Sequence, residues 1–128
     1  MNKKRILLID DDKSLTQTMK INLEGTGFYE VRIENQSENA HSSAREFRPD
    51  LILLDIVMPG LDGGDVCAIL KGDSVLQNIP IVMVTALVSN DETGNDVAVT
   101  SANLTMVAKP IRLANLIEVI ERNLAAAK

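Results

Sequence analysis

A run of four apolar residues that stops on a carboxylate constrains this chain more than any other feature of its sequence. Leu51 to Leu54 are all apolar, and Asp55 follows them directly. A half-solvated strand would alternate apolar and polar residues, so the run predicts a strand buried on both faces, as in a parallel sheet. Met58-Pro59-Gly60 and Gly63-Gly64 then end the strand and lead into a helix. On this pattern alone, Asp55 is either a site residue at a strand end or the cap of the following helix.

The rest of the chain alternates predicted strands with predicted helices. Strands are indicated by short apolar runs or strict alternation, and helices by apolar residues that recur every three or four positions. The predicted strands cover residues 5–9, 29–33, 51–54, 81–84 and 104–108, with 29–33 at an edge. The predicted helices cover residues 14–24, 37–47, 64–70, 90–99 and 113–124. This order of elements predicts an α/β fold with a doubly wound parallel sheet.

Four of the predicted strands are followed by residues that can share one site. Asp10 and Asp11 follow the first strand, Asp55 the third, Thr85 the fourth and Lys109 the fifth. In a doubly wound sheet, ligands bind beyond the carboxyl ends of the strands, where the strand order reverses. The sequence therefore predicts a site made of three carboxylates, one hydroxyl and one ammonium group.

Composition and charge exclude several classes of protein. With 128 residues the chain can bury a substantial core, and we expect a single domain over residues 1–128. The net charge of −5, without basic runs, argues against direct nucleic-acid binding. No apolar run approaches the ~20 residues of a membrane span. The apolar run that follows the basic first residues, Ile6 to Ile9, is too short for a signal peptide. Cys67 is the single cysteine, so no internal disulfide can form and a cytoplasmic location is expected.

These motifs resemble those of response-regulator receiver domains, the phosphoacceptor modules of two-component signalling. The resemblance covers residues 4–124 and rests on four segments: ILLIDDD at 6–12, DLILLDIVMPGLDG at 50–63, IPIVMVTA at 79–86 and KP at 109–110. It implies a flavodoxin-like fold with five parallel strands in the order 2-1-3-4-5 and five helices.

The resemblance also implies what the carboxylates do. Asp55 would accept a phosphoryl group from the phosphohistidine of a sensor histidine kinase or a phosphotransfer protein. Asp11, Asp55 and the backbone carbonyl of Val57 would bind Mg²⁺, with Asp10 helping through a water molecule. The chemistry agrees, because close carboxylates repel one another and Mg²⁺ favours a few carboxylates together with water and phosphate oxygens.

Two further roles follow from the same resemblance. Thr85 and Lys109 would contact the phosphoryl group, and the Lys109–Pro110 peptide bond would be cis. Phosphoryl transfer requires mainly positioning and charge neutralisation, while a carboxylate serves as the nucleophile. The chain would thus promote its own phosphorylation and also its own dephosphorylation, which would be slow. It would not be a turnover enzyme.

The residues that follow the first predicted strand also allow a second interpretation, in a different class of protein. Asp10-x-Asp12 resembles the start of a haloacid-dehalogenase-type phosphatase, in which Asp10 would be the nucleophile and Asp12 the general acid. Against this reading, the chain is short, has no cap segment and no paired acids near Lys109, and Asp55 would have no role. Flavodoxin-like cofactor binding is also disfavoured, because three carboxylates after the first strand would repel a phosphate.

Other positions bear on signalling rather than on chemistry. Met106 stands near the end of the fifth strand, where receivers often carry Tyr or Phe, and Ile111 stands where Phe is frequent. We therefore expect a shift of the fourth helix, fifth strand and fifth helix in place of a rotating aromatic ring. Of two other tempting residues, His41 is expected to be a solvated surface residue and Cys67 a small buried hydrophobe.

Overall fold

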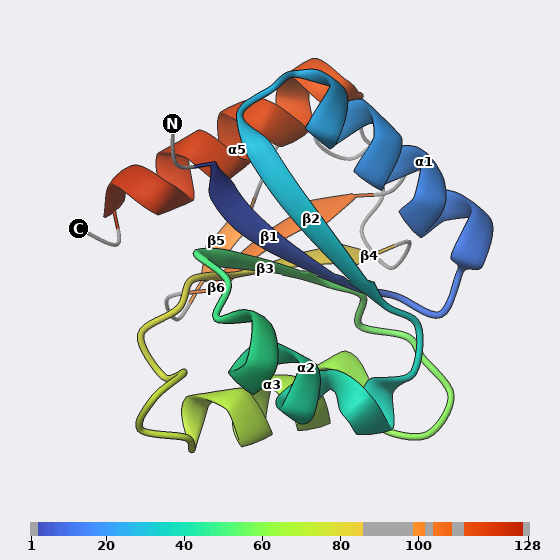
Figure 1. Cartoon of the computed structure of the whole chain (residues 1–128). Coiled ribbons are helices and arrows are strands. Elements are labelled where there is room, and N and C mark those ends of the chain that lie inside the picture. The colour runs from blue at the N-terminus through green and yellow to red at the C-terminus, as the bar shows by residue number, and fades with distance from the viewer. Residues whose placement is uncertain (1–2, 86–98, 102–103, 109–111, 127–128) are drawn as a thin grey trace.

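The residues that the structure describes form one twisted sheet with helices on both faces (Figure 1). The computed structural model describes residues 3–85, 99–101, 104–108 and 112–126, and of residues 85, 99–101, 104 and 108 the backbone alone. In chain order the elements are β1 (Lys4–Ile9), α1 (Lys13–Gly25), β2 (Tyr29–Glu34), the 3-10 helix η1 (Ser37–Asn39), α2 (Ala40–Phe47), β3 (Leu51–Leu54), α3 (Gly63–Lys71), β4 (Ile81–Thr85), β5 (Val99–Ser101), β6 (Leu104–Ala108) and α5 (Leu113–Ala126).

The sheet has the order β2-β1-β3-β4-β6-β5, and all neighbouring strands except the last pair are parallel. The five predicted strands and their order are confirmed, with β6 as the predicted fifth. The short strand β5 was not predicted; it pairs antiparallel with β6 at the edge of the sheet. Val99 begins β5, so the end of the helix predicted over 90–99 was wrong, and its remainder lies outside the described residues.

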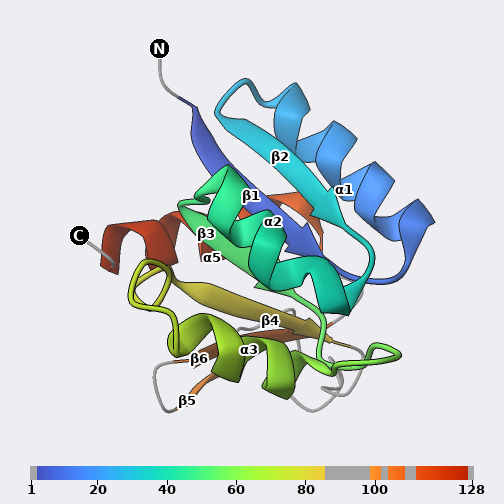
Figure 2. The same ribbon diagram turned by 60° about the horizontal axis from the view of Figure 1, so that its bottom comes forward.

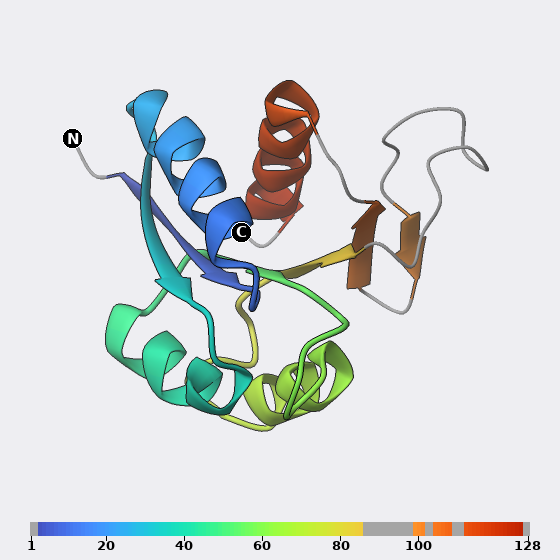
Figure 3. The same ribbon diagram turned by 90° about the vertical axis from the view of Figure 1, so that its right-hand side faces the viewer.

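Apolar runs build the sheet because both of its faces are covered. Figure 3 shows α1 and α5 on one face and α2 and α3 on the other. Successive side chains of a strand point to opposite faces, so Ile6 and Leu8 join one apolar cluster while Leu7 and Ile9 join the other. In β3, all four residues from Leu51 to Leu54 are buried. The unbroken apolar run of β3 thus serves two cores at once, as predicted.

The ends of the helices account for acidic residues that are not part of the predicted site. Asp12 is the N-cap of α1, where its side chain accepts a hydrogen bond from the Leu15 N–H at 2.9 Å. Asp62 caps α3 and forms a reciprocal capping box with Asp65. The cap of the helix that follows β3 is therefore Asp62, and the alternative prediction that Asp55 caps this helix is wrong.

One difference from the predicted helices is small. The helix predicted over 37–47 begins as η1 and continues as α2, and Asn39, the last residue of η1, has a φ of −98° and a ψ of 1°. The structure describes four α-helices within its ranges, and none of its described helices is long and apolar enough to cross a membrane.

In Figure 2 the arrowheads of β1, β2 and β4 point the same way, toward the edge where the candidate site lies.

Candidate functional site

Asp10 and Asp55 lie side by side because they follow two neighbouring strands. Ile9 and Leu54, the last residues of β1 and β3, are partners in the parallel register. The backbone hydrogen bonding continues one residue further, since the Asp10 N–H donates to the Glu34 carbonyl at 3.1 Å and the Asp55 N–H to the Ile9 carbonyl at 2.9 Å. Both aspartates are 6% exposed, so the sheet itself holds two carboxyl groups at a nearly buried edge.

Asp11 completes a compact group of three carboxylates. One oxygen each from Asp10, Asp11 and Asp55 lies within 4.8 Å of the other two. Asp11 is exposed, whereas the other two are buried. Such a set suits Mg²⁺, because this ion takes one or two carboxylates and keeps several waters, which the exposed side admits. The Asp12 N–H donates to Asp10 Oδ1 at 3.0 Å and orients that carboxylate.

The turn after β3 folds back over Asp55 at two glycines. Gly60 has a φ of 81°, a left-handed conformation that glycine adopts without strain. Gly63 packs so closely that a Cβ there would lie 2.6 Å from the Asp55 carbonyl oxygen, and its N–H donates to the Ile56 carbonyl at 2.7 Å. Within this turn Val57 is 59% exposed, and its backbone N–H donates to Asp55 Oδ1 at 3.4 Å. The turn therefore brings backbone polar groups close to the strand-end carboxylate.

The other predicted site residues are described only in part. Thr85 is the last residue of β4, and its backbone pairs with Ala108 of β6, which places it at the same edge of the sheet. Lys109 and its bond to Pro110 lie outside the described residues, as do Leu87 and Ile111. Met106 is half-buried and packs on the α2 and α3 side of the sheet. The structure thus brings together Asp10, Asp11 and Asp55, and leaves the roles of Thr85 and Lys109 as predictions.

Two polar side chains near the carboxylates were missed by the sequence analysis. Asn35 follows β2, and its side-chain amide donates to the Asp10 carbonyl oxygen. Ser37 begins η1 and its hydroxyl contacts the turn after β3. Neither position shows periodicity or a motif, because each acts through a contact with a segment far away in the sequence.

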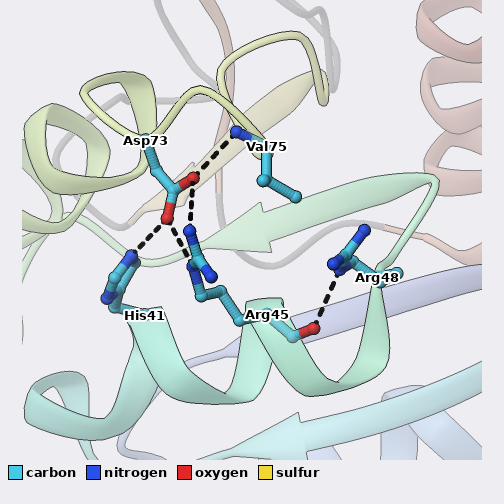
Figure 4. Close-up of polar contacts among 5 residues, drawn as sticks. All are labelled: His41, Arg45, Arg48, Asp73 and Val75. Carbon is cyan, nitrogen blue, oxygen red and sulfur yellow. Dashed lines mark hydrogen bonds and ion pairs between the residues drawn. The ribbon is translucent and has the colours of Figure 1, made fainter.

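A separate polar cluster links α2 to the loop after α3 (Figure 4). Asp73 accepts hydrogen bonds from Arg45 Nε at 2.7 Å and from the Val75 N–H at 2.8 Å, and it pairs with His41 Nε2 at 2.7 Å. The Arg45 guanidinium, and after it the His41 ring, hold the pKa of Asp73 well below its usual range. The His41 side chain is 43% exposed, as expected for a surface residue, but its partner Asp73, 32 residues away in the sequence, was not predicted. Cys67 is buried, as predicted, and burial raises the pKa of its thiol.

A parallel α/β sheet with three carboxylates at the ends of its strands is the arrangement that the sequence motifs predicted. A comparison with known protein families identifies the family. The profile of the response regulator receiver domain matches residues 6–121. The chain belongs to this family and is a receiver domain of the response regulators of two-component systems.

Curated relatives agree with this family and extend beyond it in length. The chain is 45% identical over 84 residues to the DNA-binding response regulator MtrA of Mycolicibacterium smegmatis, which is 66% of this chain and 35% of that protein. It is 41% identical over 83 residues to the DNA-binding dual master transcriptional regulator RpaA of Synechocystis sp., covering 65% of this chain and 34% of that protein. The chain thus spans about a third of the length of these relatives.

Solved structures of receiver domains superpose on nearly the whole chain. The signal receiver domain of a signal transduction histidine kinase from Syntrophus aciditrophicus is 29% identical, with a TM-score of 0.78 over 98% of this chain and 92% of that one. A response regulator receiver domain protein from Methanospirillum hungatei is 26% identical, with a TM-score of 0.77 over 98% and 97%. None of these relatives is named as a phosphatase, so the comparisons do not support the alternative in which Asp10 is the nucleophile.

Proposed function

We propose that Asp55 is the phosphoacceptor of this receiver domain and that Mg²⁺ assists the transfer. The observation that carries the proposal is the group of three carboxylates within 4.8 Å, with Asp55 at the end of a central strand. In the transfer, a carboxylate oxygen of Asp55 forms a bond to phosphorus while the bond from phosphorus to the donor's histidine nitrogen breaks. The donor's imidazole keeps the electron pair of that bond.

The residues around Asp55 divide the remaining work. Asp11, Asp55 and the Val57 carbonyl would hold Mg²⁺, with Asp10 acting through a water molecule. When bound, the ion neutralises charge on the phosphoryl oxygens and on the carboxylates that face them. Thr85 would hydrogen-bond the phosphoryl group.

Lys109 would pair with the same phosphoryl group and neutralise part of its charge. Neither Lys109 nor Thr85 takes part in bond making, so their work is positioning and charge neutralisation.

The proposal also covers partners and output. The phosphoryl donor is a sensor histidine kinase or a phosphotransfer protein, and each chain accepts one phosphoryl group rather than turning over a substrate. A cytoplasmic location agrees with a single, buried cysteine. Output runs through the segment from about residue 87 to β6 and α5, where half-buried Met106 replaces an aromatic switch. The relatives' DNA binding belongs to proteins about three times as long, and the net charge of −5 favours a protein partner for this domain.

Covalent labelling tests the phosphoacceptor directly. After incubation with a small phosphodonor and Mg²⁺, mass spectrometry should show one added phosphoryl group on the wild type and none on Asp55→Asn. Asp62→Asn is the matched control, because this carboxylate caps α3 a few residues away and is not one of the proposed metal ligands. Loss of labelling in Asp10→Asn together with full labelling of Asp55→Asn would favour the phosphatase instead.

A further inference from the structure

The connection between β2 and α2, residues 35–39, touches both loops that carry the proposed metal ligands. At its start, Asn35 Nδ2 donates to the carbonyl oxygen of Asp10 at 2.8 Å and to Thr16 Oγ1 at 3.1 Å. The first bond holds the backbone of Asp10, one of the proposed metal-holding residues. The second bond holds Thr16 in the first turn of α1, the helix that follows the loop. Asn35 therefore joins the connection to the loop between β1 and α1.

Two residues further on, Ser37 holds the other loop. Its hydroxyl donates to the Pro59 carbonyl at 3.1 Å and accepts from the Leu61 N–H at 3.0 Å. Ser37 is 3% exposed, so water does not replace these bonds readily. One small side chain thus fixes both sides of the turn between β3 and α3, two residues beyond the Val57 carbonyl.

The space around these contacts shows why the two side chains matter. A groove of about 370 Å³ lies between the connection and the turn at residues 58–60, and it extends to Asp11. Beside this groove, the hydrogen bonds of Asn35 and Ser37 join the connection to the two loops. The proposed ligands are the three carboxylates and the Val57 carbonyl, so Asn35 and Ser37 are not among them.

We propose that Asn35 and Ser37 are positioning residues that set the affinity of the acidic site for its divalent cation by fastening both ligand-bearing loops to the connection between β2 and α2. This inference rests on the proposed function, in which Asp10, Asp11, Asp55 and Val57 hold Mg²⁺. Ionised carboxylates within 4.8 Å repel one another, so loops that are not fastened would separate when the cation is absent. Binding would then have to draw them together again, and affinity would fall.

Magnesium titration by calorimetry tests the inference on the folded chain. We expect Ser37→Ala and Asn35→Ala each to weaken Mg²⁺ binding about tenfold, a common effect of losing a partner behind the ligands. The double variant should be weaker by less than the product of the two effects, because losing either bond already lets the loops separate. If Ser37→Ala does not fold, Asn35→Ala alone decides.

Two matched controls separate positioning from general stability. Ser43→Ala removes the hydroxyl of another serine, 3% exposed, which lies on α2 and donates to the Glu34 side chain. Asn39→Ala removes an amide of the same connection that bonds only the Gln36 side chain in the described contacts. Both controls should keep the Mg²⁺ affinity of the wild type even where they lower the free energy of unfolding.

The outcomes distinguish this inference from the proposed function. Saturable binding by the wild type with unchanged dissociation constants in Ser37→Ala and Asn35→Ala would overturn the inference and leave the magnesium site intact. Equal weakening in the two controls would also overturn it, because the effect would then follow stability alone. No saturable Mg²⁺ binding by the wild type would overturn both the proposed site and the inference.

Discussion

The backbone N–H of Asp55 donates a hydrogen bond to the carbonyl oxygen of Ile9 at 2.9 Å, one residue beyond the end of β3. This bond extends the parallel ladder past both strands and places Asp55 beside Asp10, the residue after Ile9. The backbone positions of the two buried aspartates are therefore set by hydrogen bonds of the sheet. Asp11 and Val57 lie on the loops that follow these two residues, and their positions depend on less regular backbone.

Removing one carboxylate should relieve repulsion at this edge. Without metal, Asp10→Asn or Asp11→Asn should raise the melting temperature, because fewer like charges meet. With Mg²⁺, the wild type should gain about 2.7 kcal/mol at a concentration one hundred times the dissociation constant, and Asp11→Asn much less. Thermal unfolding across a magnesium series measures both effects. Glu30→Gln, an exposed change on β2, is the control, and an equal magnesium response in Asp11→Asn would place the ion elsewhere.

The phosphorylated state should be long-lived. Val57 is 59% exposed next to Asp55 and is apolar, and Leu87, outside the described residues, is apolar as well. Neither side chain can orient a water molecule for attack on the phosphorus. We expect Val57→Asn with Leu87→Glu to speed phosphoryl loss roughly tenfold, about 1.4 kcal/mol of barrier. The decay in Mg²⁺ without phosphatase is measured beside Val75→Asn, an exposed control, and a wild type that clears within seconds would refute the prediction.

Gly63 should not tolerate a side chain. A Cβ at this position would lie 2.6 Å from the Asp55 carbonyl oxygen and from the Ile56 Cα, both of them backbone atoms. We expect Gly63→Ala to lower the free energy of unfolding by roughly 2 kcal/mol, measured in urea, because the turn must move. Gly25→Ala, where a Cβ meets nothing within 4 Å, should be neutral or stabilising. Equal stability of the two variants would mean that the turn is not closely packed.

The link between Asp73 and α2 should depend on pH in one direction. Its pKa is lowered in the folded state by Arg45 and His41, so its stabilisation is complete above the unfolded value of about 4 and is lost as the pH falls below it. Asp73→Asn should therefore be less stable than the wild type at pH 7, and this difference should narrow toward pH 3. Urea unfolding at several pH values measures it. Glu46→Gln, which loses an exposed pair with Arg32, is the control, and a difference independent of pH would contradict the prediction.

Local patterns in the sequence were enough for most of the fold and for the central carboxylates. The apolar runs at 51–54 and 5–9 can be satisfied only where both faces of a strand are covered, so they predicted interior parallel strands. Because parallel strands end at one edge, the aspartates that follow them had to converge there, and the structure confirms this for Asp10, Asp11 and Asp55. The strand order itself came from the family resemblance and was confirmed.

Contacts between distant segments were decided only by the tertiary structure. The short strand β5 has no pattern of its own and forms because β6 offers it a free edge. His41 meets Asp73, and Ser37 meets Pro59 and Leu61, only because α2 and the connection before it pack beside α3 and the turn that precedes it. The sequence alone determined which residues are buried in strands and which carboxylates follow them, since burial and periodicity are local. Which polar side chains hold the loops was determined by folding, since a hydrogen bond depends on distances in space that residue spacing does not encode.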